Sequence, residues 1–314
     1  MAERTHEPVL RAEAVAALSI RAEGVYVDAT FGRGGHAKSI LAQLGADGRL
    51  LALDRDPQAV TSAKQQFADE ARLDVVHAPF SMLGKIVAQR GWSGRVNGIL
   101  FDLGVSSPQL DDPTRGFSFR APGPLDMRMD PTRGESAADW LNRAEEQEIA
   151  TVLHELGDER FARRIARVIV RSREQTPITD TKQLADIVAS AIPTRERGKD
   201  PATRSFQAIR LHINRELDEL RAVLPQALDA LAPRGRLVAI SFHSLEDRIV
   251  KQFMRTQQQG EDLPLDLPVR HAEMKPRLKV IGKPLRAGEE ELKRNPRARS
   301  AVLRVAEVPE ADHV

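Results

Sequence analysis

Three aspartates in the first third of the chain each stand directly after a short apolar run: Asp28, Asp54 and Asp102. Short apolar runs of this composition are typical of strands buried in a sheet. If these strands are parallel, their carboxyl ends meet at one edge, which is where open α/β sheets bind ligands. A carboxylate at that edge can accept hydrogen bonds from the hydroxyl groups of a ligand. Three strand-end carboxylates therefore predict a ligand-binding edge.

A glycine turn separates the first of these strands from a helical pattern. The turn contains Gly32, Gly34 and Gly35, and an apolar helical periodicity follows over residues 37–44. Asp54 lies about 20 residues after the turn, the spacing at which a nucleotide-binding unit places a carboxylate on the ribose hydroxyls. This order favours nucleotide binding over a plain turn and a solvated aspartate. The glycine spacing also fits the looser dinucleotide fingerprint, so an NAD site stays open.

The hydrophobic periodicity alternates between strands and helices along most of the chain. Strands are predicted at 25–28, 50–54, 75–77, 96–102, 236–241, 278–281 and 300–305. Helices are predicted at 8–18, 37–44, 57–67, 136–142, 144–156, 160–172, 182–191 and 203–231. This order predicts an α/β fold with a doubly wound, mainly parallel sheet. We expect an antiparallel pair of strands to close the sheet, and a mainly helical insertion to interrupt it.

The segment 111–134 precedes the helices of the insertion. It contains four prolines and three glycines, too many breakers for a helix or a central strand. It also carries Phe117, Phe119 and Met127, large apolar residues that a disordered linker would lack. The segment is therefore predicted to be a long ordered loop, and such loops beside a ligand-binding edge are often functional.

The predicted helix 160–172 has one apolar face and one basic face. The basic face carries Arg160, Arg163, Arg164, Arg167 and Arg171. Arginines spaced three or four apart can hold a sugar-phosphate backbone. They can equally form a solvated face with acidic partners such as Glu159. The stretch from Arg160 to Arg173 contains no acidic residue, and both interpretations remain open.

Composition limits the remaining function classes. The chain has 314 residues, of which 41% are hydrophobic and 29% charged, and no cysteine. Disulfides, thiolate metal sites and a cysteine nucleophile are therefore excluded. Because the N-terminus is polar, we expect no signal peptide, and no apolar run approaches the ~20 residues of a membrane span. We expect a cytoplasmic protein without a membrane partner. The scattered histidines lack ligand spacing, so no metal site is expected.

The charge of the chain is unevenly distributed. The formal net charge is only +2. Residues 269–304, however, hold 11 lysines and arginines against four glutamates, a local net charge of +7. This basic C-terminal segment is compatible with a phosphate-rich partner, although a solvated surface explains it as well.

Six motifs together resemble those of one protein family. They are Thr30–His36, Asp102–Asp111, Arg115–Phe119, Gly123–Gly134, Ser241–Arg248 and Asn295–Ser300. The set is similar to that of the MraW-type family, the bacterial methyltransferases H of small-subunit ribosomal RNA. The resemblance extends over nearly the whole chain, from His6 to Ala306.

The resemblance implies an activity and a fold. Members of this family use S-adenosylmethionine to methylate N4 of a cytidine in 16S ribosomal RNA near the decoding centre. Their fold is a class I methyltransferase sheet, Rossmann-like and doubly wound, with an inserted helical domain. The expected partners are 16S ribosomal RNA or the small ribosomal subunit, and a homodimer is left open.

The resemblance also assigns residues to the cofactor. The implied S-adenosylmethionine-binding positions are Gly34, Gly35, His36, Asp54, Phe80, Asp102 and Gln109. Many amino-group methyltransferases carry an Asp/Asn-Pro-Pro-aromatic motif after the fourth strand, whereas this chain reads Asp102-Leu-Gly-Val. Asp102 is our candidate for the acceptor of the amine proton, with S-adenosylmethionine binding alone as the alternative role. Ser241 and His243 are weaker candidates.

Domain bounds and substrate residues follow from the same pattern. We expect a methyltransferase domain formed by 1–112 and 216–314, and a helical substrate-recognition domain at 113–215. A cytidine must leave its stack to react, and aromatic and arginine side chains are the usual platforms for such a base. The candidates in the loop are Phe117, Phe119, Arg120, Asp126 and Arg128.

Three other functions fit parts of the sequence. An NAD-dependent oxidoreductase would use the same glycine turn, but the antiparallel closing strands and the basic insertion disfavour it. A DNA amino-methyltransferase would share the fold and differ in substrate. A non-enzymatic RNA-binding protein is disfavoured by the strand-end carboxylates, because acidic groups repel RNA unless a cofactor uses them.

Overall fold

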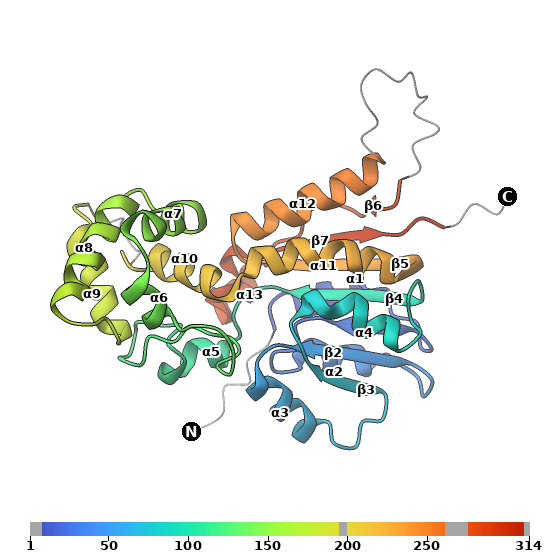
Figure 1. Ribbon diagram of the computed structural model, residues 1–314. Helices are drawn as coiled ribbons and strands as arrows, with labels where there is room; N and C mark the ends of the chain where they lie inside the picture. The colour runs from blue at the N-terminus through green and yellow to red at the C-terminus, as the bar shows by residue number, and fades with distance from the viewer. Residues whose placement is uncertain (1–7, 195–199, 261–275, 311–314) are drawn as a thin grey trace, which may run out of the picture. The chain divides into compact units, whose positions relative to one another are not determined.

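The computed structural model describes residues 8–194, 200–260 and 276–310. The chain forms two compact units, drawn in Figure 1. The first unit consists of Met1–Gly104 and Leu217–Val314, and the second of Val105–Glu216. Residues 269–275 of the basic C-terminal segment lie outside the described residues. No helix in the described ranges is both long and apolar enough to span a bilayer.

The first unit is built on one seven-stranded sheet. In spatial order the strands are β3 (Leu73–His77), β2 (Arg49–Asp54), β1 (Val25–Asp28), β4 (Val96–Asp102), β5 (Leu231–Ser241), β7 (Val302–Glu307) and β6 (Lys279–Val280). Strands β1 to β5 pair in parallel, whereas β7 pairs antiparallel with both β5 and β6. The predicted doubly wound sheet with an antiparallel closing strand is therefore confirmed.

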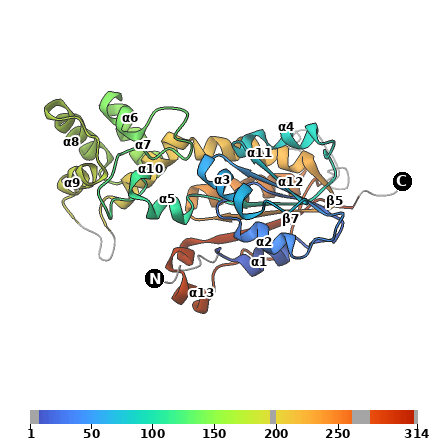
Figure 2. The same ribbon diagram turned by 90° about the horizontal axis from the view of Figure 1, so that it is seen from below.

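Helices cover both faces of this sheet (Figures 1 and 2). One face packs against α4 (Leu83–Gln89), α11 (Glu216–Ala230) and α12 (Ser244–Gln259). The other packs against α1 (Arg11–Ala17), α2 (Gly35–Leu41) and α3 (Pro57–Gln66). Because side chains alternate along a strand, Leu51 of β2 joins the first core and its neighbour Leu50 joins the second. Burial on both faces explains why the strands appear in the sequence as continuous apolar runs.

Helix α3 begins as its sequence predicts. Asp56 is the N-cap, and its side chain accepts a hydrogen bond from the backbone N–H of Gln58 at 2.9 Å. Pro57 occupies the first helical position, where it needs no N–H donor. This cap fixes the direction in which the chain leaves the end of β2.

The second unit is a helical cluster around its own core. Its helices are α5 (Ser107–Asp111), α6 (Ala137–Arg143), α7 (Glu146–Gly157), α8 (Ala162–Gln175), α9 (Thr181–Ala191) and α10 (Thr203–Asn214). Trp140 lies at the centre, fully buried, and donates from its indole N–H to Glu148 at 2.7 Å. Apolar side chains from each of the helices α6 to α10 join this core.

The proline- and glycine-rich segment 111–134 is ordered, as expected. The buried side chain of Asn214 accepts from the N–H of Met129 and donates to the carbonyl of Met127, both at 2.7 Å. The guanidinium of Arg115 donates to the carbonyls of Arg128 and Met129 at 3.1 and 2.9 Å. These contacts satisfy backbone polar groups in a segment whose only regular structure is the 3-10 helix Pro113–Arg115.

One prediction about the helices was wrong. The pattern from Thr203 to Leu231 is not one helix, because Arg215 takes a left-handed conformation with φ 50° and ends α10. Helix α11 begins at the next residue and ends at Ala230, and β5 starts at Leu231. Arg215 is neither glycine nor asparagine, so residue type gave no signal for the break.

Candidate active site

Three strand-end carboxylates lie at the same edge of the sheet. Asp28, the last residue of β1, pairs in register with Ala52 of β2 and Leu100 of β4. Asp54 and Asp102 each lie two residues further along the neighbouring strands. The parallel register therefore brings all three acids to the carboxyl edge. Asp28 directly precedes the glycine turn, and Asp54 and Asp102 lie on the strands at either side of β1.

Asp54 connects β2 to the glycine turn. Its carboxylate accepts hydrogen bonds from the N–H of Gly32 at 2.7 Å and from the N–H of Asp56 at 2.8 Å. Burial raises the pKa of Asp54 to about 6, although these two backbone donors act in the opposite direction. The carboxylate can accept further hydrogen bonds from a ligand. Its charged form is disfavoured by burial until such donors are present.

The glycine turn needs its glycines for two reasons. Gly34 has φ 73°, a left-handed conformation that most other residues avoid. A Cβ on Gly34 would also lie 2.6 Å from the ring of Phe31 and 3.0 Å from the ring of Phe67. A Cβ on Gly35, the first residue of α2, would lie 2.2 Å from the ring of Pro8. Substitution at either glycine requires the turn or the rings packed against it to shift.

His36 lies between two of the acids. Its Nε2 is 3.4 Å from Oδ2 of Asp102, and the imidazole is 4% exposed. Burial lowers the pKa of His36, but the Asp102 and Asp28 carboxylates outweigh it, so the net shift is upward. Burial likewise raises the pKa of Asp28 to about 6, partly offset by His36. The three side chains therefore form one coupled charge cluster.

Thr30 fixes the end of β4 and was not singled out as a functional residue. Its hydroxyl accepts a hydrogen bond from the backbone N–H of Asp102 at 2.6 Å, and its own N–H donates to Asp28 at 3.2 Å. Thr30 therefore links the ends of β1 and β4. The only signal for this link in the sequence is a threonine two residues after a strand-end aspartate.

Several buried polar atoms at this edge have no hydrogen-bond partner. They are Oδ2 of Asp28, Nδ1 and Nε2 of His36, Oδ1 of Asp102 and Oγ of Ser241. An unsatisfied buried polar group costs about 1–3 kcal/mol. A cluster of such atoms at the ligand-binding edge of an α/β sheet fits a polar ligand that supplies the missing partners.

Ser241 and His243 lie at the end of β5, next to β4 in the sheet. The register pairs Asp102 with Ile240, so Ser241 follows directly at the same edge. Nε2 of His243 is 3.1 Å from a carboxylate oxygen of Glu246, which is 2% exposed. Glu246 also accepts from the N–H of Phe242 at 2.9 Å. His243 is the N-cap of α12, so it also has a structural role.

Phe80 and Gln109 complete the predicted cofactor positions. Phe80 is partly buried just after β3 and packs edge-to-face on Phe101 of β4, with ring centroids 5.9 Å apart. Gln109 belongs to the second unit and is 5% exposed. Its side-chain oxygen accepts from the N–H of Ser106 at 2.9 Å in the capping box of α5. Gln109 thus has a structural contact within its own unit.

The predicted substrate residues of the second unit differ in accessibility. Phe117 is only 6% exposed and belongs to the helical core, so its ring offers no open face to a base. Phe119 is partly buried and packs on Phe206 with centroids 4.8 Å apart. Asp126 accepts two hydrogen bonds from the guanidinium of Arg128 at 2.8 and 2.7 Å. Arg120 is exposed.

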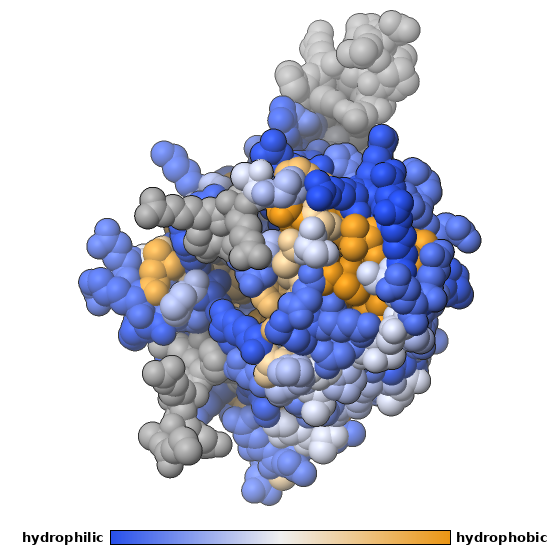
Figure 3. All heavy atoms as spheres, turned by 90° about the vertical axis from the view of Figure 1, so that its left-hand side faces the viewer, coloured by the Kyte–Doolittle hydropathy of each residue, from blue (hydrophilic) through white to orange (hydrophobic). Residues whose placement is uncertain are grey.

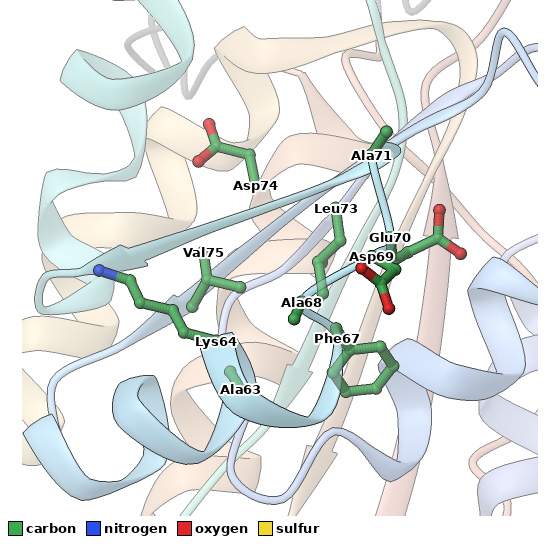
Figure 4. Close-up of a pocket in the computed structure, with 10 residues that line it drawn as sticks. All are labelled: Ala63, Lys64, Phe67, Ala68, Asp69, Glu70, Ala71, Leu73, Asp74 and Val75. Carbon is green, nitrogen blue, oxygen red and sulfur yellow. The ribbon is translucent and has the colours of Figure 1, made fainter.

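A separate surface hollow lies between the end of α3 and β3 (Figure 4). Its lining includes Lys64, Phe67 and Asp74, and none of the predicted cofactor or substrate residues. Within the described ranges, no group of three or more histidines and acids could hold a metal ion.

Comparison with known proteins decides the family. The model of the MraW methylase family matches residues 3–309. The chain belongs to this family. It is 58% identical over 304 residues to the Ribosomal RNA small subunit methyltransferase H of Nitrosococcus oceani, with 96% of both chains covered. The protein of the same name from Thioalkalivibrio sulfidiphilus is 58% identical over 303 residues, again with 96% coverage of both chains.

One solved structure gives a more distant match. An rRNA methylase from Streptococcus thermophilus superposes with a TM-score of 0.43 at 11% identity, covering 98% of this chain and 99% of that one. This likeness is too weak to support an inference about the site.

Proposed function

We propose that the protein transfers the methyl group of S-adenosylmethionine to the N4 amine of a cytidine in 16S ribosomal RNA, near the decoding centre. The observation that carries the proposal is the 58% identity to ribosomal RNA small subunit methyltransferases H over 96% of both chains. The buried, unpartnered polar atoms at the sheet edge are consistent with it. The expected partners are 16S ribosomal RNA or the small ribosomal subunit, which implies a cytoplasmic location.

The first unit supplies most of the proposed cofactor site. Asp54 accepts hydrogen bonds from the two ribose hydroxyls, and Phe80 packs against the adenine. The backbone at Gly34 and Gly35 allows the ligand to approach, because no Cβ intervenes. His36 and Asp102 hold the charged amino-acid end of the ligand. Gln109, assigned to the same ligand by the family resemblance, remains a prediction.

Asp102 has a second proposed role. S-adenosylmethionine, when bound, supplies a methyl group activated by its positively charged sulfur. The N4 amine of cytosine is a weak nucleophile, since its lone pair is conjugated with the ring. Oδ1 of Asp102 is buried and has no protein partner, so it can accept a hydrogen bond from the amine and then take its proton. Thr30 and His36 orient the strand end and the carboxylate for this task.

The second unit is proposed to bind the RNA. Arg120, Phe119 and the Asp126–Arg128 pair are the candidates for holding the displaced base. Phe117 is assigned a packing role, because its ring is enclosed by the helical core.

Mass mapping of 16S ribosomal RNA tests the proposal. RNA from a strain that lacks the protein should lack one methyl group on a cytidine, and purified protein with S-adenosylmethionine should restore it on small subunits from that strain. Duplex DNA should not be methylated under the same conditions. Restoration by NAD in place of S-adenosylmethionine, or an unchanged RNA in the deletion strain, would contradict the proposal.

A further inference from the structure

Helix α8 of the second unit presents a row of arginines to solvent. We call Arg163, Arg164, Arg167 and Arg171, together with Arg160 just before the helix, the arginine face; all five are exposed. The opposite side of the helix is buried through Ala162, Ile165, Ala166 and Ile169. The apolar side anchors α8 in the helical core, so the arginine face is carried on a fixed support.

The positive charges of this face are largely unused within the protein. Arg167 lies 3.7 Å from a carboxylate oxygen of Glu146. No carboxylate within the described ranges comes within 4.0 Å of the other four guanidinium groups. Glu159, the neighbour that could have paired with Arg163, is buried and accepts from the N–H of Phe161 at 3.0 Å instead. Like charges three and four residues apart repel each other along a helix.

The arginine face is a local concentration of charge. Residues 105–216 contain as many acidic as basic residues, so a general basic excess does not account for it. Arg173, in contrast, turns inward and donates to the carbonyls of Leu141 and Ala144 at 2.5 and 2.6 Å. Figure 3 faces the side of the molecule on which Figure 1 draws α8 and α9, and hydrophilic residues cover most of it.

The shape of the face indicates the kind of partner. From Arg163 to Arg171 the face extends over about 12 Å of α-helix. Such a row is too long for one small anion and suits a linear polyanion. Arginine is the residue best matched to phosphate, because its planar guanidinium donates two parallel hydrogen bonds and is weakly hydrated.

We propose that the arginine face of α8 binds the sugar-phosphate backbone of the RNA substrate. This inference rests on the proposed function and names the surface that positions the RNA. Contacts to phosphate fix orientation and contribute affinity without reading sequence. The face therefore contributes to RNA affinity, and the methyl-transfer step itself does not depend on it.

The test uses three full-length variants. The first carries Arg163→Gln, Arg164→Gln and Arg171→Gln, and the second changes the same residues to lysine. The control carries Lys85→Gln, Lys251→Gln and Arg255→Gln, which removes three exposed cations from the first unit. Filter binding of a 16S ribosomal RNA transcript is measured over a range of salt concentrations. Calorimetry with S-adenosylmethionine checks that the cofactor site is intact.

The glutamine variant should bind the transcript about tenfold more weakly or worse at low salt. Its slope of log affinity against log salt should be shallower by about 2, since each phosphate contact to single-stranded RNA contributes about 0.7. The lysine variant should keep most of the slope, and the control should match the wild type. All three should bind S-adenosylmethionine normally.

Three results would overturn the inference. One is a glutamine variant that matches the control in affinity and slope, and another is a lysine variant as weak as the glutamine variant. The third is a loss of binding to assembled small subunits without a loss on the transcript, which would assign the face to an acidic ribosomal protein. Wild-type protein that binds the transcript with the expected slope but methylates no cytidine would refute the proposed function alone.

Discussion

Asp102 is the residue on which the proposed chemistry depends most. Three neighbours define its position: β4 carries it, Thr30 accepts from its N–H at 2.6 Å, and His36 lies 3.4 Å from Oδ2. One carboxylate oxygen therefore lies beside the imidazole of His36, and the other is buried without a hydrogen-bond partner. A carboxylate held in this way can accept a proton without first rearranging.

Replacement of Asp102 by asparagine separates its two roles. Asn keeps the shape but cannot take a proton at neutral pH, so the single-turnover rate of methyl transfer should fall about 100-fold or more. Affinity for S-adenosylmethionine should fall less than tenfold, because hydrogen-bonding capacity remains. Asp74→Asn, at an exposed carboxylate on β3, serves as the control and should change neither quantity. A large loss of cofactor affinity with unchanged chemistry would limit Asp102 to binding.

Asp28 should give the protein a measurable pH dependence. Its pKa is about 6 in the folded state, above the usual value of 3.8, because burial disfavours the charge. The folded protein then binds more protons than the unfolded chain between about pH 4 and pH 6, so the free energy of unfolding falls as pH rises through this window.

Asp28→Asn removes that titration. Relative to the wild type, the variant should gain about 2–3 kcal/mol of unfolding free energy between pH 4 and pH 7. A pH-independent loss of stability caused by the new amide does not affect this difference, because it is the same at pH 4 and at pH 7. Urea unfolding at several pH values measures the difference, and two parallel stability curves would show that Asp28 does not titrate in this range.

At the scale of elements, the turn between β1 and α2 is the part most sensitive to substitution. Gly34→Ala should destabilise the fold by more than the ~1–2 kcal/mol of a left-handed alanine, because its Cβ would overlap the rings of Phe31 and Phe67. Binding of S-adenosylmethionine should weaken at least tenfold, since the turn must shift.

Gly91→Ala is the matched control for this prediction. Gly91 has φ 69°, close to that of Gly34, and a Cβ there would meet no atom within 4 Å. It should cost only the conformational penalty and leave cofactor binding unchanged. Thermal unfolding and calorimetry report both effects, and equal behaviour of the two variants would show that crowding in the turn is unimportant.

Elements were predictable where local sequence decides them. The helix predicted at 57–67 starts where expected, because Asp56 and Pro57 are residue types that favour the N-cap and the first helical position. The break at Arg215 did not, because a left-handed arginine is stabilised by the surrounding fold and leaves no residue-type signal. The order of the loop 111–134 could be inferred from its large apolar residues. The hydrogen bonds from Asn214 that hold this loop could not be inferred, because Asn214 lies 87 residues from Met127 in the sequence.

At the scale of the whole molecule, the topology was readable because both faces of the sheet are buried. Each central strand is a continuous apolar run that ends in a polar residue, so the edge that carries Asp28, Asp54 and Asp102 could be located from the sequence. The solvent accessibility of individual side chains could not be predicted in this way. Phe117 has the type expected of a base-stacking residue, yet it lies in the helical core, because the burial of an aromatic depends on distant partners.

Division into two units also separates the proposed tasks. Nearly all of the proposed cofactor residues lie in the first unit, whereas the arginine face and the loop 111–134 lie in the second. Substitutions in the arginine face and at Arg120 are therefore expected to change RNA affinity and to leave the affinity for S-adenosylmethionine unchanged.

Calorimetric titration of the purified protein with S-adenosylmethionine and with NAD tests the central claim most directly. We expect one S-adenosylmethionine bound per chain and no heat with NAD. The variant Asp54→Ala, which lacks the acceptor for the ribose hydroxyls, should bind S-adenosylmethionine at least tenfold more weakly. Tight binding of NAD, or an Asp54→Ala variant that binds S-adenosylmethionine like the wild type, would contradict the claim.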